Sequence, residues 1–277
     1  MPKMLDFSDP TTLAAGTGVA TVVATHPIWL KALGIKKPDE PIVGGEAAAT
    51  GGKDDLSEVR EYFNTVGFDR WNKIYSDSDE VNKVQLDIRD GHQVTIDTVL
   101  QWVDEDKANV EGKTFCDLGC GVGTLAIPLA KRGAIVSASD ISDAMATEAA
   151  RRAQEQGVTT ATFEASNLES VTGQYDTVTC IDVMIHYPTD KMKGMVGHLA
   201  SISKDRLLIS FAPKTAAYVL LKKIGELFPG PSKTTRAYLH PEDDVRAALE
   251  SVRTRPALPL SYRQRTPTAL SPIARPS

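Results

Sequence analysis

The chain has 277 residues, a formal net charge of −5 and 24% charged residues, which suits one globular domain with extensions. An acidic balance offers no electrostatic footprint for nucleic acid, so we expect no nucleic-acid partner. Its three cysteines, Cys116, Cys120 and Cys180, are an odd number, which favours reduced thiols over a disulfide framework. Because Cys116 and Cys120 lack a second cysteine pair, we predict no protein-bound metal.

The N-terminal part is predicted to be an extension followed by a helical arm. Residues 1–54 are rich in Ala, Thr, Gly and Pro, which indicates either a targeting segment or disorder. Asp55, followed by Glu58, is typical of a helix cap, and apolar residues at helical spacing continue to Ile74. We therefore predict a helical arm and cap over residues 55–110. A second helix in this arm is marked by Ile96, Val99, Leu100 and Val103.

The next feature is a strand that breaks into three glycines at alternate positions, Gly119, Gly121 and Gly123. A glycine turn between a strand and a helix brings backbone N–H groups and the positive end of the helix to a ligand. The dinucleotide fingerprint G-x-G-x-x-G has its third glycine one residue later, where this chain has Thr124. Together with Asp117, the pattern Asp-x-Gly-x-Gly-x-Gly resembles the first motif of S-adenosylmethionine (SAM) dependent methyltransferases. A carboxylate suits the cationic SAM, whereas it would repel a dinucleotide phosphate.

The following strand ends in a second carboxylate, Asp140. An acid at such a strand end, roughly 20 residues after the first motif, can accept hydrogen bonds from both ribose hydroxyls. The alternative is that Asp140 caps the helix that begins after Ile141 and Ser142. The presence of both acidic residues around the glycine turn favours the ribose role.

Strands and helices alternate from residue 111 to about residue 250. This alternation predicts an α/β fold in which a parallel sheet carries helices on both faces. The expected elements are strand 114–118, helix 124–131, strand 135–139, helix 142–156, strand 160–165, strand 175–182, helix 188–203, strand 206–212, and helices at about 215–228 and 241–250.

The tail, residues 251–277, is atypical, because it holds five prolines and five arginines and no acidic residue. It shows neither a strand nor a helix period, and proline-rich sequence of this kind does not form a central strand. We predict that the closing strands of the sheet are missing and that strand 206–212 is an exposed edge. Unpaired apolar edges recruit other chains, so we also predict aggregation and weak activity.

Five further stretches, 61–75, 80–85, 182–188, 212–215 and 221–233, have distinctive sequences. Together they resemble the magnesium protoporphyrin IX methyltransferases of chlorophyll synthesis, over about residues 55–250. The resemblance implies a class I SAM-dependent methyltransferase fold with a Rossmann-like sheet. It implies a SAM-binding core over 111–250 that carries a substrate lid at about 213–240.

The implied reaction moves a methyl group from SAM to a propionate carboxylate of magnesium protoporphyrin IX and gives the monomethyl ester. Magnesium is then present only as part of the porphyrin. The resemblance also implies a chloroplast protein, peripherally associated with envelope or thylakoid membranes, with magnesium chelatase subunits as partners. The alternatives are an impaired variant that binds SAM or porphyrin without turnover, and another small-molecule methyltransferase.

The resemblance also implies which residues act. A propionate has a pKa of about 4.3, so it is already ionised at neutral pH and needs orientation rather than a base. Tyr75 and His186 match family residues thought to matter for catalysis, and each side chain can donate a hydrogen bond to a carboxylate. Tyr75 could instead be an aromatic packing residue. His186 could instead be a polar loop residue or an axial ligand of the porphyrin magnesium. The implied SAM-binding residues are Asp117, Gly119, Gly121, Gly123, Asp140, Ile141, Asn167 (at the adenine amine), Leu168 and Asp182.

Overall fold

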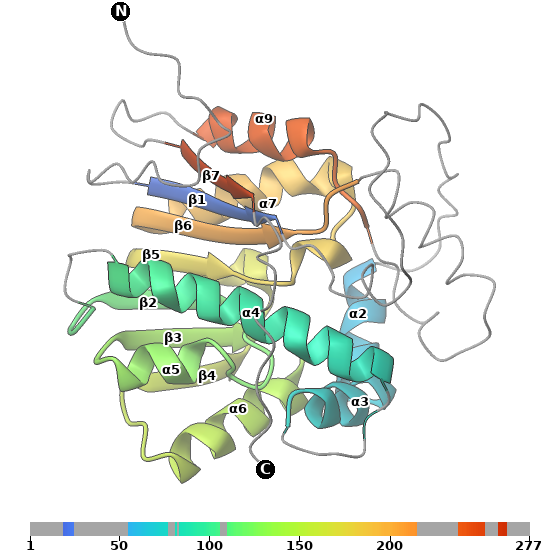
Figure 1. The fold of residues 1–277 in the computed structure, drawn as a ribbon, viewed down its shortest axis with the longest axis vertical. Coiled ribbons are helices and arrows are strands. Elements are labelled where there is room, and N and C mark those ends of the chain that lie inside the picture. The colour runs from blue at the N-terminus through green and yellow to red at the C-terminus, as the bar shows by residue number, and fades with distance from the viewer. Residues whose placement is uncertain are drawn as a thin grey trace, which may run out of the picture.

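The computed structural model describes residues 19–24, 55–76, 81, 83–105, 110–214, 238–252 and 260–264. These residues form a seven-stranded sheet in the order β4-β3-β2-β5-β6-β1-β7, in which all neighbouring strands are parallel (Figure 1). The strands are β1 (Val19–Ala24), β2 (Thr114–Leu118), β3 (Ile135–Asp140), β4 (Ala161–Ala165), β5 (Tyr175–Cys180), β6 (Ser203–Phe211) and β7 (Leu260–Gln264).

The described helices are split between an arm and the layers around the sheet. The arm precedes β2 in sequence, whereas the other helices connect or follow the strands, as in a βαβ fold. They are α2 (Asp55–Asn64), α3 (Val66–Ile74), α4 (Lys83–Glu105), α5 (Ala126–Lys131), α6 (Asp143–Glu155), α7 (Thr189–Ser201) and α9 (Glu242–Val252), with short 3-10 helices at Leu168–Ser170 and Met184–His186.

The core has two apolar clusters on opposite faces of the sheet. Successive side chains of a strand point to opposite faces, and on β6 Leu207 and Ile209 belong to one cluster while Leu208 belongs to the other. The first cluster contains buried residues of α7 and α9, and the second contains buried residues of α4 and α5. The predicted α/β fold with helices on both faces of a parallel sheet is therefore confirmed.

Most predicted elements of the core lie within a few residues of their expected bounds. The expected helix 124–131 begins later, at Ala126, because Thr124 and Leu125 belong to the glycine turn. The arm contains three helices, since the apolar stripe that ends at Ile74 is divided between α2 and α3. The helix expected at 215–228, and most of the lid expected at 213–240, lie outside the described residues.

The predicted exposed edge at 206–212 is wrong. Strand β6 pairs along its outer side with β1, where Val22 faces Ile209, and β1 in turn pairs with β7, where Val22 faces Tyr262. The sequence of β1, Val-Ala-Thr-Val-Val-Ala, is rich in β-branched residues and suits a strand. Residues 1–54 are therefore not wholly outside the folded sheet.

The absence of any strand in residues 251–277 is also wrong, because β7 spans Leu260–Gln264. No proline lies within β7, since Pro259 precedes it and Pro267 follows it, so its backbone N–H groups are available for pairing. All the strand pairings of β6, β1 and β7 among the described residues are parallel. The division into an arm at 55–110 and a core at 111–250 stays a prediction.

Candidate functional site

The glycine turn between β2 and α5 needs its glycines. Gly119, Gly121 and Gly123 have φ angles of 76°, 51° and 84°, in the left-handed region that side chains with a Cβ rarely adopt. A Cβ on Gly119 would also lie 2.1 Å from Cγ2 of Val183, which is closer than atoms can approach. The turn therefore runs close against the loop that follows β5, at the carboxyl ends of the strands, where open α/β sheets bind ligands.

Asp117, at the end of β2, is buried and only partly satisfied. Its Oδ1 accepts a 2.7 Å hydrogen bond from the Thr179 hydroxyl, while Oδ2 has no partner among the described residues. Burial raises the pKa of Asp117 to about 6, against the lowering effect of the Thr179 hydrogen bond. An unpaired buried carboxylate oxygen beside the turn suits a ligand that brings a positive charge, as SAM does.

Asp140, at the end of β3, holds the same turn in place. Its Oδ2 accepts a 2.9 Å hydrogen bond from the backbone N–H of Gly121, and its Oδ1 accepts one of 2.9 Å from the backbone N–H of Ser142. Burial raises the pKa of Asp140, although these two bonds oppose the rise. The N-cap of α6 is Ser142, whose hydroxyl accepts from the Met145 N–H, so Asp140 is not that cap. Each carboxylate oxygen of Asp140 can accept a further hydrogen bond, so the two bonds leave room for ribose hydroxyls. The ribose role stays a prediction.

The remaining predicted cofactor residues follow β3 and β4 at the same edge of the sheet. Ile141 comes directly after β3 and is partly buried. Asn167 follows β4 and caps the 3-10 helix Leu168–Ser170 by accepting a 3.5 Å hydrogen bond from the backbone N–H of Glu169. Leu168 is buried. These positions are consistent with contacts to an adenosine group, and their roles stay predictions.

The arm brings Tyr75 to the same region. Tyr75 is the C-cap residue of α3, and its ring lies 5.5 Å from the Trp71 ring and 4.4 Å from the His92 ring, measured between centroids. Burial raises the pKa of the Tyr75 hydroxyl, and the negative charge of Asp182 raises it further. The hydroxyl therefore stays protonated at neutral pH and remains a hydrogen-bond donor.

His92, on α4, was not predicted as a site residue, yet it lies at the centre of this region. Its Nδ1 lies 2.8 Å from Oδ2 of Asp182, and its Nε2 lies 2.8 Å from the Thr124 hydroxyl. A sequence signal did exist, because His92 lies four residues before Ile96 and so shares the buried face of α4.

Asp182 follows β5 and has an unusual backbone. Its φ is 60°, in the left-handed region, which costs energy for a residue other than glycine. Ser210 holds it, since the Ser210 hydroxyl accepts a 2.6 Å bond from the Asp182 N–H and donates a 3.0 Å bond to Oδ1. Burial alone would raise the pKa of Asp182, but the bonds from His92 and Ser210 outweigh it and leave the pKa below its ordinary value.

His186 lies in the 3-10 helix Met184–His186, a few residues after Asp182. Its ring meets the Phe63 ring edge to face at 5.3 Å, and its Nδ1 is buried without a partner among the described residues. Burial lowers the pKa of His186 to about 4, although Asp182 opposes the shift. The imidazole is therefore neutral at pH 7, and one of its nitrogens carries a hydrogen that can be donated.

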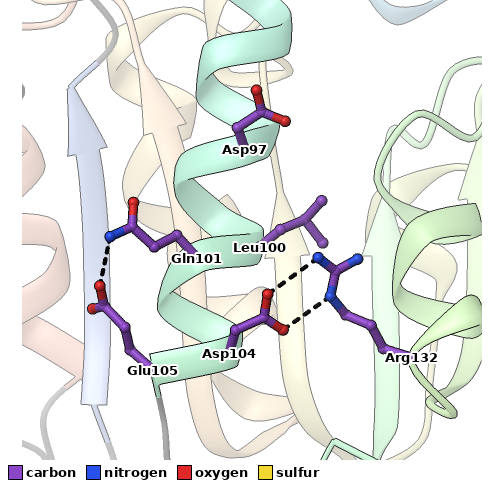
Figure 2. A pocket seen from close by; sticks show the side chains of 6 residues that line it. All are labelled: Asp97, Leu100, Gln101, Asp104, Glu105 and Arg132. Atoms are coloured by element: carbon purple, nitrogen blue, oxygen red, sulfur yellow. Dashed lines mark hydrogen bonds and ion pairs between the residues drawn. The ribbon is translucent and has the colours of Figure 1, made fainter.

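A surface hollow of about 350 Å³ lies elsewhere, along the outer side of α4 (Figure 2). Figure 2 shows Arg132 paired through Nε and Nη2 with the carboxylate of Asp104, and Gln101 bonded to Glu105. None of the predicted site residues lines this hollow. The candidate site is therefore the region between the arm and the carboxyl ends of β2, β3 and β5.

Two protein-family models match parts of the chain. A family model described as magnesium-protoporphyrin IX methyltransferase C-terminus matches residues 180–266, and a methyltransferase domain model matches residues 115–206. The first match extends to residue 266, so the likeness to the family includes β7 and does not end at about residue 250 as predicted.

Two curated relatives are similar over most of the chain. The chloroplastic magnesium protoporphyrin IX methyltransferase of Arabidopsis thaliana is 57% identical over 203 residues, which are 73% of this chain and 65% of that protein. The magnesium-protoporphyrin O-methyltransferase of Synechocystis is 54% identical over 198 residues, which are 71% of this chain and 85% of that protein. The chain thus spans slightly less than two thirds of the Arabidopsis protein.

Crystal structures of the Synechocystis magnesium protoporphyrin IX methyltransferase show the same fold. The structure with bound S-adenosylhomocysteine has a TM-score of 0.65 at 51% identity and covers 72% of this chain and 89% of that one. The structure with bound SAM has a TM-score of 0.64 at 45% identity, with 74% and 88% covered. The Rossmann-like class I methyltransferase fold implied by the sequence is therefore confirmed.

Proposed function

This chain belongs to the magnesium protoporphyrin IX methyltransferase family, and we propose that it transfers a methyl group from SAM to a propionate carboxylate of magnesium protoporphyrin IX. The observation that carries the proposal is the meeting of two kinds of group at one edge of the sheet. The glycine turn and Asp117 suit a cationic cofactor, and the neutral donors Tyr75 and His186 suit a carboxylate substrate. The product is the monomethyl ester of an intermediate in chlorophyll synthesis.

The residues of the cofactor site have complementary roles in this proposal. SAM, when bound, supplies an electrophilic methyl group on a sulfonium. Asp117 offers its unpaired buried oxygen to the positive charges, and Asp140 accepts from the ribose hydroxyls while it holds Gly121. Asn167 accepts from the adenine amine, and Ile141, Leu168 and Asp182 contact the bound SAM. Magnesium enters only as part of the porphyrin.

The residues of the substrate site orient a group that is already reactive. A propionate has a pKa of about 4.3 and is ionised at neutral pH, so no general base is required. Tyr75 keeps its hydroxyl proton because its pKa is raised, and His186 is neutral because its pKa is lowered. Each donates one hydrogen bond to the carboxylate, which aligns an oxygen with the methyl group, and the aromatic arm excludes water.

We place the protein in the chloroplast, because its Arabidopsis relative is described as chloroplastic. Among the described helices, none combines the length and the apolar character of a membrane-crossing segment. We propose peripheral association with envelope or thylakoid membranes and contact with magnesium chelatase subunits. Release from isolated membranes by carbonate would support the peripheral association, and retention after carbonate treatment would contradict it.

The decisive experiment is an assay of methyl transfer by this 277-residue chain. Purified protein, SAM with a labelled methyl group and magnesium protoporphyrin IX should give labelled monomethyl ester. Metal-free protoporphyrin IX and a porphyrin without propionate groups are the controls. Binding of SAM and porphyrin without any labelled ester would overturn the proposal and favour the impaired variant.

A further inference from the structure

We propose that His92 is a positioning residue that couples the glycine turn to Tyr75, an inference that rests on the proposed function. Its ring contacts three parts of the site that are distant in sequence. One nitrogen contacts Asp182 after β5, the other contacts Thr124 in the turn, and the ring face lies on Tyr75 of the arm. Only 11% of the His92 side chain is exposed, so the ring lies largely inside the protein.

The charge on Asp182 sets the role of the His92 nitrogen that faces it. The pKa of Asp182 is below its ordinary value, so the carboxylate is ionised at neutral pH and can only accept. Nδ1 of His92 therefore donates to Asp182, and Nε2 lies within hydrogen-bond distance of the Thr124 hydroxyl. This assignment follows from the pattern of hydrogen bonds. An ionised acid on one side and a hydroxyl on the other orient the imidazole plane.

The same contacts give a reason for Thr124. In the dinucleotide fingerprint this position is a glycine that allows close packing of helix and strand. Here the position carries a hydroxyl that reaches α4 from the turn. Asparagine at position 92 could replace the Nδ1 donor that meets Asp182, but it has no ring to place a second polar atom beside Thr124 or a face against Tyr75.

Contact between His92 and Tyr75 extends this link to the substrate side. The two rings are 4.4 Å apart between centroids and tilted by 36°, close to an offset stack. A small displacement of the turn on cofactor binding therefore shifts His92 through Thr124, and His92 shifts Tyr75. The consequence for catalysis is that Tyr75 reaches its productive position when the cofactor site is filled.

A spectroscopic experiment tests this link without turnover. In protein carrying carbon-13-labelled tyrosine, the Tyr75 ring signal is identified by its absence in Tyr75→Phe. Addition of S-adenosylhomocysteine should shift this signal in the wild type, and Thr124→Val should lose most of the shift. Thr124→Ser should restore it, because the hydroxyl is retained. Thr98→Val is the matched control, since among the described residues the Thr98 hydroxyl bonds to the Val94 carbonyl of its own helix.

A double-mutant cycle in kcat tests the catalytic consequence. At saturating SAM and magnesium protoporphyrin IX, Thr124→Val should lower kcat about fivefold, because residues joined through one network are energetically coupled. The same substitution in Tyr75→Phe protein should have almost no further effect. His92→Asn, which keeps a donor for Asp182, is a second variant that should behave like Thr124→Val.

The outcomes separate this inference from the proposed function. An unchanged Tyr75 shift in Thr124→Val, or additive effects in the cycle while the wild type forms the ester, would overturn the role of His92 and leave the proposed function standing. A wild type that binds S-adenosylhomocysteine but forms no ester would remove the proposed function. In that case the Tyr75 signal still decides whether the turn and the arm are linked.

Discussion

Nη1 of Arg152 donates a 2.8 Å hydrogen bond to the backbone carbonyl of Tyr75, so a helix of the core holds the end of the arm. Nη2 of the same side chain lies 2.6 Å from the side-chain oxygen of Asn72, one turn earlier in α3. Arg89 of α4 approaches the same helix end, with its Nε 2.6 Å from the Ile74 carbonyl. Cations near the last carbonyls of a helix stabilise its C-terminus, and here they also fix the position of Tyr75.

We predict that Arg152→Ala lowers kcat by roughly tenfold or more while SAM affinity changes little. The substitution removes the bonds that fix Tyr75, and a hydrogen bond from a charged group contributes about 1.5–3 kcal/mol. Steady-state kinetics and calorimetry with S-adenosylhomocysteine are the measurements. Arg151→Ala is the matched control, because Arg151 is exposed and its charge pairs with Glu148 and Glu155 on its own helix. Equal kinetic losses in both variants would contradict the prediction.

We predict that the affinity for S-adenosylhomocysteine falls as the pH drops below about 6. The pKa of Asp117 is raised to about 6, so its carboxylate gains a proton as the pH falls and no longer attracts the ligand ammonium. At pH 5 the ionised fraction is roughly one tenth, so the Kd should rise roughly tenfold relative to pH 7. Calorimetry across this range tests the prediction.

The matched variants are Asp117→Asn, which should flatten the profile, and Asp104→Asn on the outer side of α4, which should leave it unchanged.

Protonation of Asp117 has the opposite effect on the stability of the folded protein. A raised carboxyl pKa gives a contribution that is present below the unfolded pKa of 3.8 and is lost as the pH rises through about 6. Asp117→Asn should therefore raise the melting temperature near neutral pH.

We predict that Tyr75→Phe and His186→Phe each lower kcat by about 10- to 100-fold, with smaller effects on SAM affinity. Each removes one donor to the substrate carboxylate, and a bond to a charged group is worth about 1.5–3 kcal/mol. Tyr175→Phe is the control. Tyr175 is the first residue of β5, and its hydroxyl bonds to the carbonyl of Thr172 just before that strand rather than to a residue of the candidate site. Poor SAM binding with normal turnover at saturation would show that the assigned roles are wrong.

Absorption spectra distinguish two roles for His186, which are hydrogen-bond donor to the propionate and ligand of the porphyrin magnesium. If its imidazole were an axial ligand of the porphyrin magnesium, His186→Phe would shift the absorption of bound magnesium porphyrin. Metal-free porphyrin would then bind equally well to the wild type and the variant. We expect no such shift, because a hydrogen bond to a propionate leaves the magnesium ligands unchanged.

We predict that Asp140→Ala raises the Kd for SAM at least tenfold. The change removes the acceptor for the ribose hydroxyls and the bond that holds Gly121, each a hydrogen bond to a charged group worth about 1.5–3 kcal/mol. Asp140→Asn retains an acceptor and should lose less. Calorimetry on a folded variant is the measurement, and an unchanged affinity for Asp140→Ala would remove the ribose assignment.

We predict slow amide exchange in β1 and β7. Both strands are paired in the parallel sheet, so their hydrogen-bonded amides should exchange far more slowly than those of an unstructured chain. A chain that ends at residue 258 should melt at a lower temperature, because β1 then becomes an edge. Rapid exchange throughout residues 19–24 and 260–264 would contradict this pairing.

Features that depend on neighbouring residues could be predicted from the amino-acid sequence. Gly119, Gly121 and Gly123 encode a turn locally, since the backbone there requires positive φ angles. Asp117 and Asp140 end their strands, and the alternation of apolar strands and amphipathic helices predicted both the sheet and its parallel direction. Because parallel strands end at one edge, the common location of both acids could also be inferred.

Contacts between residues far apart in the chain could not be predicted in this way, because they form only when the chain folds. His92 lies 32 residues from Thr124 and 90 from Asp182, and no local pattern encodes their meeting. The pairing of β6 with β1, and of β1 with β7, likewise joins the two ends of the chain across the whole sequence. Strand pairing depends on which edge is free once the sheet has formed, and this is decided by packing rather than by local propensity.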